Sequence, residues 1–330
     1  MNTITRHYID GAFVESHGRE VMDIINPTNS KVIGRVTLAD EEDTRHAIVA
    51  AKHAFASFGR TTKEERAKIL CRLHEVVSAR VDVGVGQTIM RDGAATMKRV
   101  TLELGGKSPN ILLDDANLEK AIPTALIIAF LNSGQACAAG TRLLVPRKRL
   151  DAVRRAIVDA IAEFPVGDPS DPKTAVGPMM NQKQYERVQS YIRKGIEEGA
   201  EVLIGGEGHP RGLDAGYFVK PTVFVNVTND MTIAREEIFG PVLCVIAYET
   251  DEDAIRIAND TNFGLHAFVS GTDIQRARRV ASQILAGRVA INGMLDDQQA
   301  PFGGFKHSGV GREFGTFGIE AFLEPRAILE

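Results

Sequence analysis

The feature that most constrains the fold is a regular alternation of apolar runs and helical patterns through most of the chain. Runs of strand length occur at residues 143–145, 222–225, 242–248, 265–269 and 289–291. Segments with apolar residues at helical spacing lie between several of these runs. A strand that is followed by a crossover helix returns parallel to its neighbour. The alternation therefore predicts an α/β fold with an open, mostly parallel sheet flanked by helices.

Capping residues mark the ends of the predicted helices. Asp40, which acidic residues follow, predicts the start of a helix that ends at Gly59. Asp115 or Asn117 opens another predicted helix, and Gly134 ends it. Further helices are predicted at residues 62–80, 87–97, 151–164, 181–198, 251–260 and 273–285. These helices supply the crossovers that a parallel sheet requires.

The N-terminal part differs from the rest, since residues 7–38 predict short strands and turns. Residues 83–86 read Val-Gly-Val-Gly. A dinucleotide-binding fingerprint needs a third glycine and a strand before the first, and both are missing from this pattern. We therefore interpret residues 83–86 as a flexible join between two predicted helices.

Composition excludes several classes of partner. The chain has 330 residues and a formal net charge of -4, which gives no electrostatic basis for binding nucleic acid or an anionic membrane. Its three cysteines cannot form a paired disulfide framework and favour a reducing compartment. The longest apolar run, near residues 125–131, is too short to span a bilayer, and no signal peptide is recognised at the N-terminus. We expect a soluble, cytoplasmic protein, and the length favours two domains.

Two residues form a candidate catalytic pair. Cys137 follows a polar, glycine-bearing segment, whereas Cys71 and Cys244 lie in apolar patterns typical of a core. Glu103 lies between two leucines and is followed by two glycines. A thiol nucleophile and a carboxylate base are sufficient for acyl transfer. The alternative interpretations are a buried core cysteine and an outward-facing strand residue, and no metal-ligand spacing stands out.

Five motifs carry a resemblance to a known family. They read Leu-Glu-Leu-Gly-Gly-Lys-Ser-Pro at residues 102–109, Phe-x-Asn-x-Gly-Gln-x-Cys at 130–137, Glu-Glu-Ile-Phe-Gly-Pro-Val at 236–242, Asn-x-Thr-x-x-Gly-Leu at 259–265, and Pro-Phe-Gly-Gly-Phe-Lys-x-Ser-Gly at 301–309. In this order and spacing they resemble the signature motifs of the aldehyde dehydrogenase superfamily. The resemblance covers the chain from Val85 onward, and the N-terminal 80 residues are similar to the family's opening strands and helices.

The resemblance implies a mechanism with assigned roles. Cys137 would attack a small-molecule aldehyde, and a thioester on its sulfur would follow hydride transfer to NAD or NADP. Glu103 would activate the water that hydrolyses the thioester. Glu237 would hold the nicotinamide ribose, and Phe239 would pack at the nicotinamide ring. The backbone N–H of Cys137 would supply half of an oxyanion hole.

The sequence departs from the family's pattern in one large respect. Between about residues 82 and 84, on the order of 150 residues of the nucleotide-binding domain are absent. Residues 1–105 are thus predicted to be a remnant of that domain, a truncated Rossmann-type region. Residues 106–318 are predicted to form the catalytic domain and residues 319–330 a C-terminal oligomerisation strand, which implies a homo-oligomer.

This departure leaves three hypotheses about function. The first is an oxidoreductase of the aldehyde dehydrogenase family. The second is a cofactor-independent esterase or thioesterase that uses Cys137 and Glu103 on a small ester. The third is a non-catalytic relic or an interaction protein that assembles through exposed strand edges.

Overall fold

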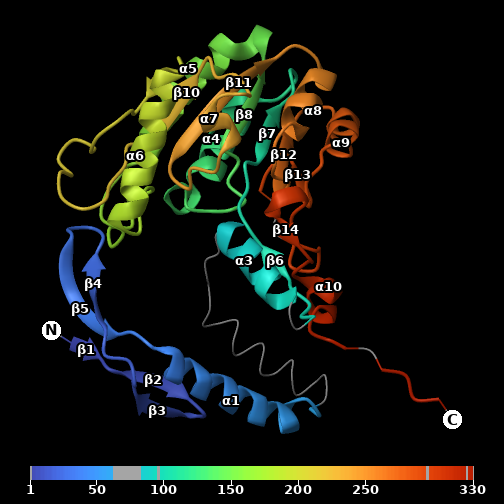
Figure 1. Ribbon diagram of the computed structural model, residues 1–330. Coiled ribbons are helices and arrows are strands. Elements are labelled where there is room, and N and C mark those ends of the chain that lie inside the picture. Colours follow the sequence, from blue (N-terminus) through green and yellow to red (C-terminus); the bar gives the residue numbers. More distant parts are fainter. Residues whose placement is uncertain (1, 62–82, 95–96, 295–296, 325, 330) are drawn as a thin grey trace. The chain divides into compact units, whose positions relative to one another are not determined.

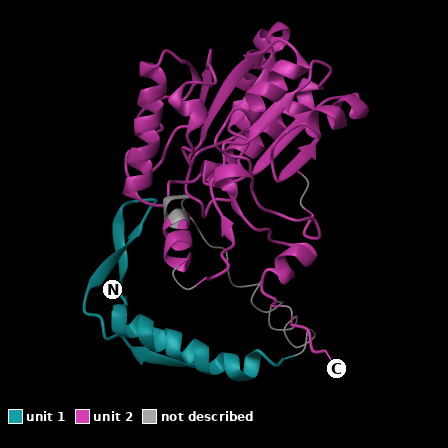
Figure 2. Cartoon of the chain, turned by 45° about the vertical axis from the view of Figure 1, so that its right-hand side comes forward, with its two compact units in different colours: residues 1–80 teal, residues 81–330 magenta. Residues whose placement is uncertain are grey.

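The computed structural model describes residues 2–61, 83–94, 97–294, 297–324 and 326–329. The chain forms two compact units, Met1–Arg80 and Val81–Glu330 (Figure 2). The helix predicted at residues 62–80, which contains Cys71, lies outside the described residues. Each unit is described by itself, and the predicted domain boundaries after residues 105 and 318 stay predictions.

The larger unit is built on a seven-stranded sheet (Figure 1). Its strand order is β13-β12-β7-β8-β11-β10-β9, and every neighbouring pair is parallel except β10 with β9. The strands are β7 (Pro109–Leu112), β8 (Arg142–Pro146), β9 (Glu201–Ile204), β10 (Thr222–Val225), β11 (Val242–Tyr248), β12 (His266–Ser270) and β13 (Arg288–Ile291). The predicted α/β class with an open, mostly parallel sheet is confirmed.

Helices cover both faces of this sheet because its strands are apolar on both sides. Eight of the ten buried residues on β7 and β11 belong to one of two large apolar clusters, on alternating faces. One cluster includes α4 (Leu118–Phe130) and α5 (Leu150–Ala160), and the other includes α6 (Gln182–Glu197), α7 (Thr232–Arg235), α8 (Asp251–Asn259) and α9 (Ile274–Ala281). The side chain of Asn117 accepts a hydrogen bond from Lys120 N and so caps α4. Of the two predicted caps, Asp115 and Asn117, the structure therefore has Asn117.

Smaller elements complete the larger unit. The helix α3 (Val83–Ala94) includes residues 83–86, so the predicted flexible join is helical in the structure. The short strands β6 (Leu102–Glu103) and β14 (Gly309–Val310) pair antiparallel, and α10 (Gly315–Glu320) follows. The remaining short elements are the 3₁₀ helices η1 (Leu131–Gly134), η2 (Arg147–Arg149), η3 (Ile161–Glu163) and η4 (Lys306–Ser308). In the single chain residues 326–329 have no regular secondary structure, and their pairing with a partner strand stays a prediction.

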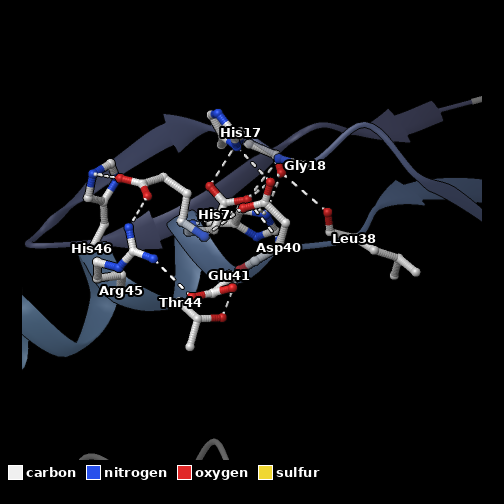
Figure 3. A network of polar contacts seen from close by, with 12 residues as sticks. His7, His17, Gly18, Leu38, Asp40, Glu41, Thr44, Arg45 and His46 are labelled. Carbon is white, nitrogen blue, oxygen red and sulfur yellow. Dashed lines mark hydrogen bonds and ion pairs between the residues drawn. The ribbon is translucent and has the colours of Figure 1, made fainter.

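The described part of the smaller unit, residues 2–61, holds a three-stranded sheet of order β1-β5-β4, a hairpin and one helix. The elements are β1 (Asn2–Ile4), β2 (Arg6–Ile9), β3 (Ala12–Glu15), β4 (Val21–Asn26), β5 (Lys31–Thr37) and α1 (Glu41–Phe58). Asp40 caps α1 in a capping box with Asp43, as predicted (Figure 3). The buried Asp43 carboxylate also accepts bonds from His17 N and Gly18 N, so it fixes the start of α1 against the loop after β3.

The candidate catalytic residues precede the strands of the large sheet. Glu103 lies just before β7, Cys137 before β8, and Glu237 before β11. Because these three strands are parallel neighbours, their amino ends meet at one edge of the sheet. No helix in the part of the chain that the structure describes is long and apolar enough to cross a membrane.

Candidate active site

The segment before Cys137 has an unusual backbone. Asn132, Ser133 and Gly134 have φ values of 50°, 60° and 72°, in the left-handed region. Two hydrogen bonds hold this turn, since Ser133 Oγ donates to Gly177 O over 3.1 Å and Gly177 N donates to Ser133 Oγ over 2.9 Å. Non-glycine residues adopt such φ values at a cost, which the surrounding contacts must offset. The turn therefore presents Cys137 in one fixed position.

The Cys137 thiol is partly buried and lies among negative charges. Burial raises its pKa, and the charges of Glu237 and then Glu103 raise it further. The backbone N–H groups of Ala138 and Cys137 act in the opposite direction because they stabilise a thiolate. The net pKa lies above the ordinary thiol value, so this cysteine is mainly protonated at neutral pH and needs a base to become a nucleophile.

Two glycines bring Glu237 close to the Cys137 backbone. Gly106 N donates to Glu237 Oε1 over 3.0 Å. A Cβ atom on Gly105 would lie 2.1 Å from Glu237 Oε2, and one on Gly106 would lie 2.5 Å from the carbonyl oxygen of Cys137. Neither position has room for a side chain. The two glycines of the first motif therefore let the Glu237 carboxylate and the Cys137 backbone approach the same short segment.

Glu103 occupies the same edge of the sheet, in a half-buried position. Its two carboxylate oxygens are shielded from solvent and have no hydrogen-bond partner among the described residues. Burial raises the pKa of Glu103 to about 7, the charge of Glu313 adds to this effect, and Arg312 opposes it. A carboxyl group with this pKa exchanges protons near neutral pH, which is the range that a general base requires.

The glycine-rich segment near the C-terminus forms part of the wall around Glu103. A Cβ atom on Gly303 would lie 2.6 Å from Glu103 Oε1. Ser308 is fully buried, and its Oγ donates to Gly105 O over 2.7 Å and accepts from Gly264 N over 3.0 Å. From sequence, the glycines of this segment are assigned no role in the chemistry. The segment's contacts with Glu103 and Gly105 arise from residues far apart in sequence, and no local pattern encodes them.

The Cys137 turn and the segment of the third motif touch each other. A Cβ atom on Gly134 would lie 2.2 Å from the carbonyl oxygen of Gly240. Phe239 lies on this segment, half-buried, with a φ of 59°. The structure thus brings Cys137, Glu103 and Glu237 together at one edge of the sheet, with Phe239 on the adjoining backbone.

Three side chains that the sequence did not single out hold this segment from α6. Gln184 Nε2 donates to the carbonyl oxygens of Ile238 and Phe239 over 3.1 and 2.7 Å. Arg187 Nη2 donates to Glu237 O over 2.8 Å, and Tyr191 OH donates to Glu236 Oε2 over 2.6 Å. We call Gln184, Arg187 and Tyr191 the α6 row. Polar residues at helical spacing look like a solvated face in sequence, so no signal distinguished them.

Among the described residues, a fit to a dinucleotide is found at the nicotinamide end alone. Glu237 bonds Gly106 N next to the Cys137 backbone, and Phe239 follows two residues later, where the family resemblance would put the nicotinamide ribose and ring. At the start of α3, a Cβ atom on Gly86 would lie 2.8 Å from Leu104 Cδ2, so this glycine serves helix packing and leaves no cradle for phosphate. The described residues show no group of three or more side chains that could hold a metal ion.

Comparisons with known proteins agree on one family. A family model described as "Aldehyde dehydrogenase family" matches residues 13–83 and 81–328, two segments that meet at the predicted join. A "putative aldehyde dehydrogenase" of Staphylococcus haemolyticus is 49% identical over 243 residues, which are 74% of this chain and 51% of that protein. A putative aldehyde dehydrogenase of Staphylococcus aureus is 50% identical over 243 residues, again 74% of this chain and 51% of that protein. The chain thus spans about half the length of the curated relatives it matches.

Solved structures show the same likeness. An aldehyde dehydrogenase of Pseudomonas syringae, crystallised as a mutant with NAD+ and octanal, has a TM-score of 0.92 and 30% identity, with 97% of this chain and 95% of that chain covered. An aldehyde dehydrogenase of Mycobacterium tuberculosis with NAD+ has a TM-score of 0.85 and 29% identity, with 97% of each chain covered.

Proposed function

Because the chain belongs to the aldehyde dehydrogenase family, we propose that it oxidises a small aldehyde to the carboxylic acid through a covalent intermediate on Cys137. The observation that carries this proposal is the meeting of Cys137, Glu103 and Glu237 around Gly105 and Gly106. A nucleophile, a base and a polar cofactor contact then lie at one edge of the sheet. The relatives give no support to the esterase hypothesis or to the interaction-protein hypothesis.

The residues of the chain carry defined steps in this proposal. The Cys137 sulfur attacks the aldehyde carbon after its proton passes to a base, and the Cys137 N–H stabilises the oxygen that becomes negative. Glu237 and Phe239 would hold the nicotinamide end of NAD(P), which would accept the hydride whose loss from the carbon turns the Cys137 adduct into a thioester. Glu103 then takes a proton from water, and the water oxygen attacks the thioester and releases the acid and the Cys137 thiol.

The state of Glu103 suits this role. Its pKa of about 7 leaves a large fraction ionised at neutral pH, and its two oxygens have no hydrogen-bond partner among the described residues. An ionised oxygen without a competing donor is available to a water molecule. Conversion of Glu103 to an amide therefore removes the base without adding volume, and thioester hydrolysis would slow by about 10²-fold or more.

Mass spectrometry of the trapped intermediate tests the proposal. The full chain is incubated with octanal, the aldehyde of the Pseudomonas syringae structure, and with NAD at about 10 mM to allow for weak binding. We expect Glu103→Gln to accumulate an octanoyl group on Cys137, and Cys137→Ala to form neither this adduct nor NADH. Cys244→Ala, which changes a fully buried thiol, should still form NADH. NADH production by Cys137→Ala at the parental rate would refute the proposal.

Three further statements rest on family and composition alone. We propose that the protein acts in the cytoplasm, that it forms a homo-oligomer, and that its cofactor is NAD or NADP. The last of these follows the NAD+ present in the solved relatives. Cross-linking and light scattering on the full chain would test the homo-oligomer.

A further inference from the structure

The α6 row contacts one short segment, residues 236–239. Three of its hydrogen bonds reach backbone carbonyls and the fourth reaches the Glu236 carboxylate, with lengths between 2.6 and 3.1 Å. Val188, also on α6, packs on the next residue, since a Cβ atom on Gly240 would lie 2.5 Å from Val188 Cγ2. The contact between Val188 and Gly240 limits how closely α6 and this segment approach. The hydrogen bonds fix which residues of the two lie opposite each other.

These bonds hold the backbone at Glu237 and the two residues after it, together with the side chain of the residue before it. The carbonyl of Glu237 itself is held by Arg187, the two following carbonyls by Gln184, and the preceding side chain by Tyr191. A carboxylate at this position can move only through its own side-chain torsions. It then reaches Gly106 N, where Oε1 accepts a bond of 3.0 Å.

The negative charge of the Glu237 carboxylate affects the ionisation of the Cys137 thiol. Glu237 is the strongest electrostatic neighbour of the Cys137 thiol, and Glu103 is the second. A nearby negative charge favours the neutral thiol over the thiolate. Two other titratable groups feel the Glu237 charge. Burial lowers the pKa of the Lys107 amine, which Glu237 partly offsets. Burial raises the pKa of Tyr191 to about 12, with smaller contributions from Glu236 and then Glu237.

We propose that the α6 row positions Glu237, and that Glu237 in this position restrains the reactivity of the Cys137 thiol. Gln184, Arg187 and Tyr191 are therefore positioning residues, because they act through Glu237 and not on a substrate. The inference rests on the proposed function in one respect, the role of Cys137 as the nucleophile.

Alkylation of Cys137 by iodoacetamide tests the inference without aldehyde or cofactor. The rate is measured on the full chain from pH 6 to 10, and peptide mass spectrometry separates Cys137 from the other two cysteines. We expect Glu237→Gln to shift the profile to lower pH and to raise the rate at pH 7.5 by about 3- to 10-fold, since more thiolate is present. Gln184→Met changes no charge, and we expect a shift in the same direction of about 2- to 3-fold.

Two matched variants complete the design. Gln182→Met makes the same exchange on the same helix, at an exposed side chain that bonds Glu186, and should leave the profile unchanged. Tyr191→Phe removes one hydroxyl and keeps the ring, so it carries the test if Gln184→Met does not fold. We expect it to shift the profile in the direction of Gln184→Met.

Each result has one meaning. If Glu237→Gln leaves the profile unchanged, the restraint by Glu237 is refuted. If Glu237→Gln shifts it but folded Gln184→Met and Tyr191→Phe do not, positioning by the α6 row is refuted. The expected shifts in a chain that oxidises no aldehyde would refute the proposed function and leave this inference standing.

Discussion

At the residue scale, the chemistry of Glu103 depends on neighbours that the sequence places far from it. Gly303 leaves room for its carboxylate, Glu313 and burial raise its pKa to about 7, and Arg312 limits the rise. The first motif identifies Glu103 as the proposed base, but only the fold determines the pKa of its carboxyl group. The same neighbours also make Glu103 a source of instability.

The raised pKa of Glu103 predicts a gain in stability on its removal. An unfolded glutamate ionises near pH 4.3, whereas folded Glu103 ionises near pH 7. As pH rises between these values only the unfolded state loses its proton, so the folded state becomes less stable. We expect Glu103→Gln to raise the free energy of unfolding by about 1 kcal/mol at pH 8, after allowance for solvent screening at this half-exposed group.

Thermal unfolding of the two proteins at pH 4 and pH 8 checks this expectation. The gain should be present at pH 8 and close to zero at pH 4, where Glu103 is mostly protonated in both states. Equal melting temperatures of parent and Glu103→Gln at pH 8 would contradict the raised pKa. A variant of an exposed acid, Glu252→Gln, should show no such dependence on pH.

Sequence singled out three candidate residues that lie together in the structure, but not the residues that hold them in place. Cys137, Glu103 and Glu237 stand in motifs whose residue types are tied to one chemistry. Gln184 and Gly303 contact backbone atoms of segments far away in the chain, and many residue types can make such contacts. Their roles become visible only when the three-dimensional structure is known.

At the element scale, the position of β8 in the sheet depends on one buried cation. Arg142 is fully buried at the first position of β8. Its guanidinium donates to Lys107 O, Ile257 O and Ala258 O and to Asn229 Oδ1, over 2.9 to 3.0 Å. Arg142 therefore joins the end of α8 to residues 103–107. This segment contains Glu103 and the two glycines that contact Glu237.

Loss of this guanidinium should strongly destabilise the larger unit. Arg142→Met keeps much of the volume but leaves three buried carbonyls without their donor. We expect the free energy of unfolding to fall by about 3 to 5 kcal/mol. Arg256→Met, which removes an exposed ion pair with Asp253, should cost less than about 0.5 kcal/mol. Urea unfolding followed by circular dichroism measures both, and similar losses for the two variants would argue against this role of Arg142.

Periodicity predicted the helices and strands well, and capping residues predicted several of their ends. The helix expected at residues 181–198 occupies Gln182–Glu197, and the one expected at 251–260 occupies Asp251–Asn259. The error at residues 83–86 has a clear cause. Glycines there predict a break, but Gly86 packs closely on Leu104, and this tertiary contact stabilises a helix.

At the scale of the whole molecule, the two units follow the two segments that match the family model. One unit ends at Arg80, and the matches meet at residues 81–83. Sequence could predict a discontinuity here because the family's motifs lie on either side of it. It could not predict the order of strands in the large sheet, which depends on β12 and β13 lying on the opposite side of β7 from β8.

This organisation predicts weak binding of the cofactor. The described residues offer contacts for the nicotinamide end, at Glu237 and Phe239, but Gly86 packs on Leu104 where a phosphate cradle would be needed. With contacts at one end of the dinucleotide only, we expect a dissociation constant for NAD of about 1 mM or weaker, which corresponds to about -4 kcal/mol.

Calorimetric titration of the full chain with NAD measures this affinity. If the nicotinamide end supplies most of the binding, Glu237→Gln should weaken it about tenfold further, since a charged hydrogen-bond acceptor for the ribose is lost. Glu252→Gln is the matched control, because it makes the same exchange at an exposed acid on α8, outside the segment that carries Glu237. A micromolar constant would contradict the expectation and would show that further residues bind the adenosine end. The same constant in Glu237→Gln as in the parent would show that the nicotinamide ribose is not held by Glu237.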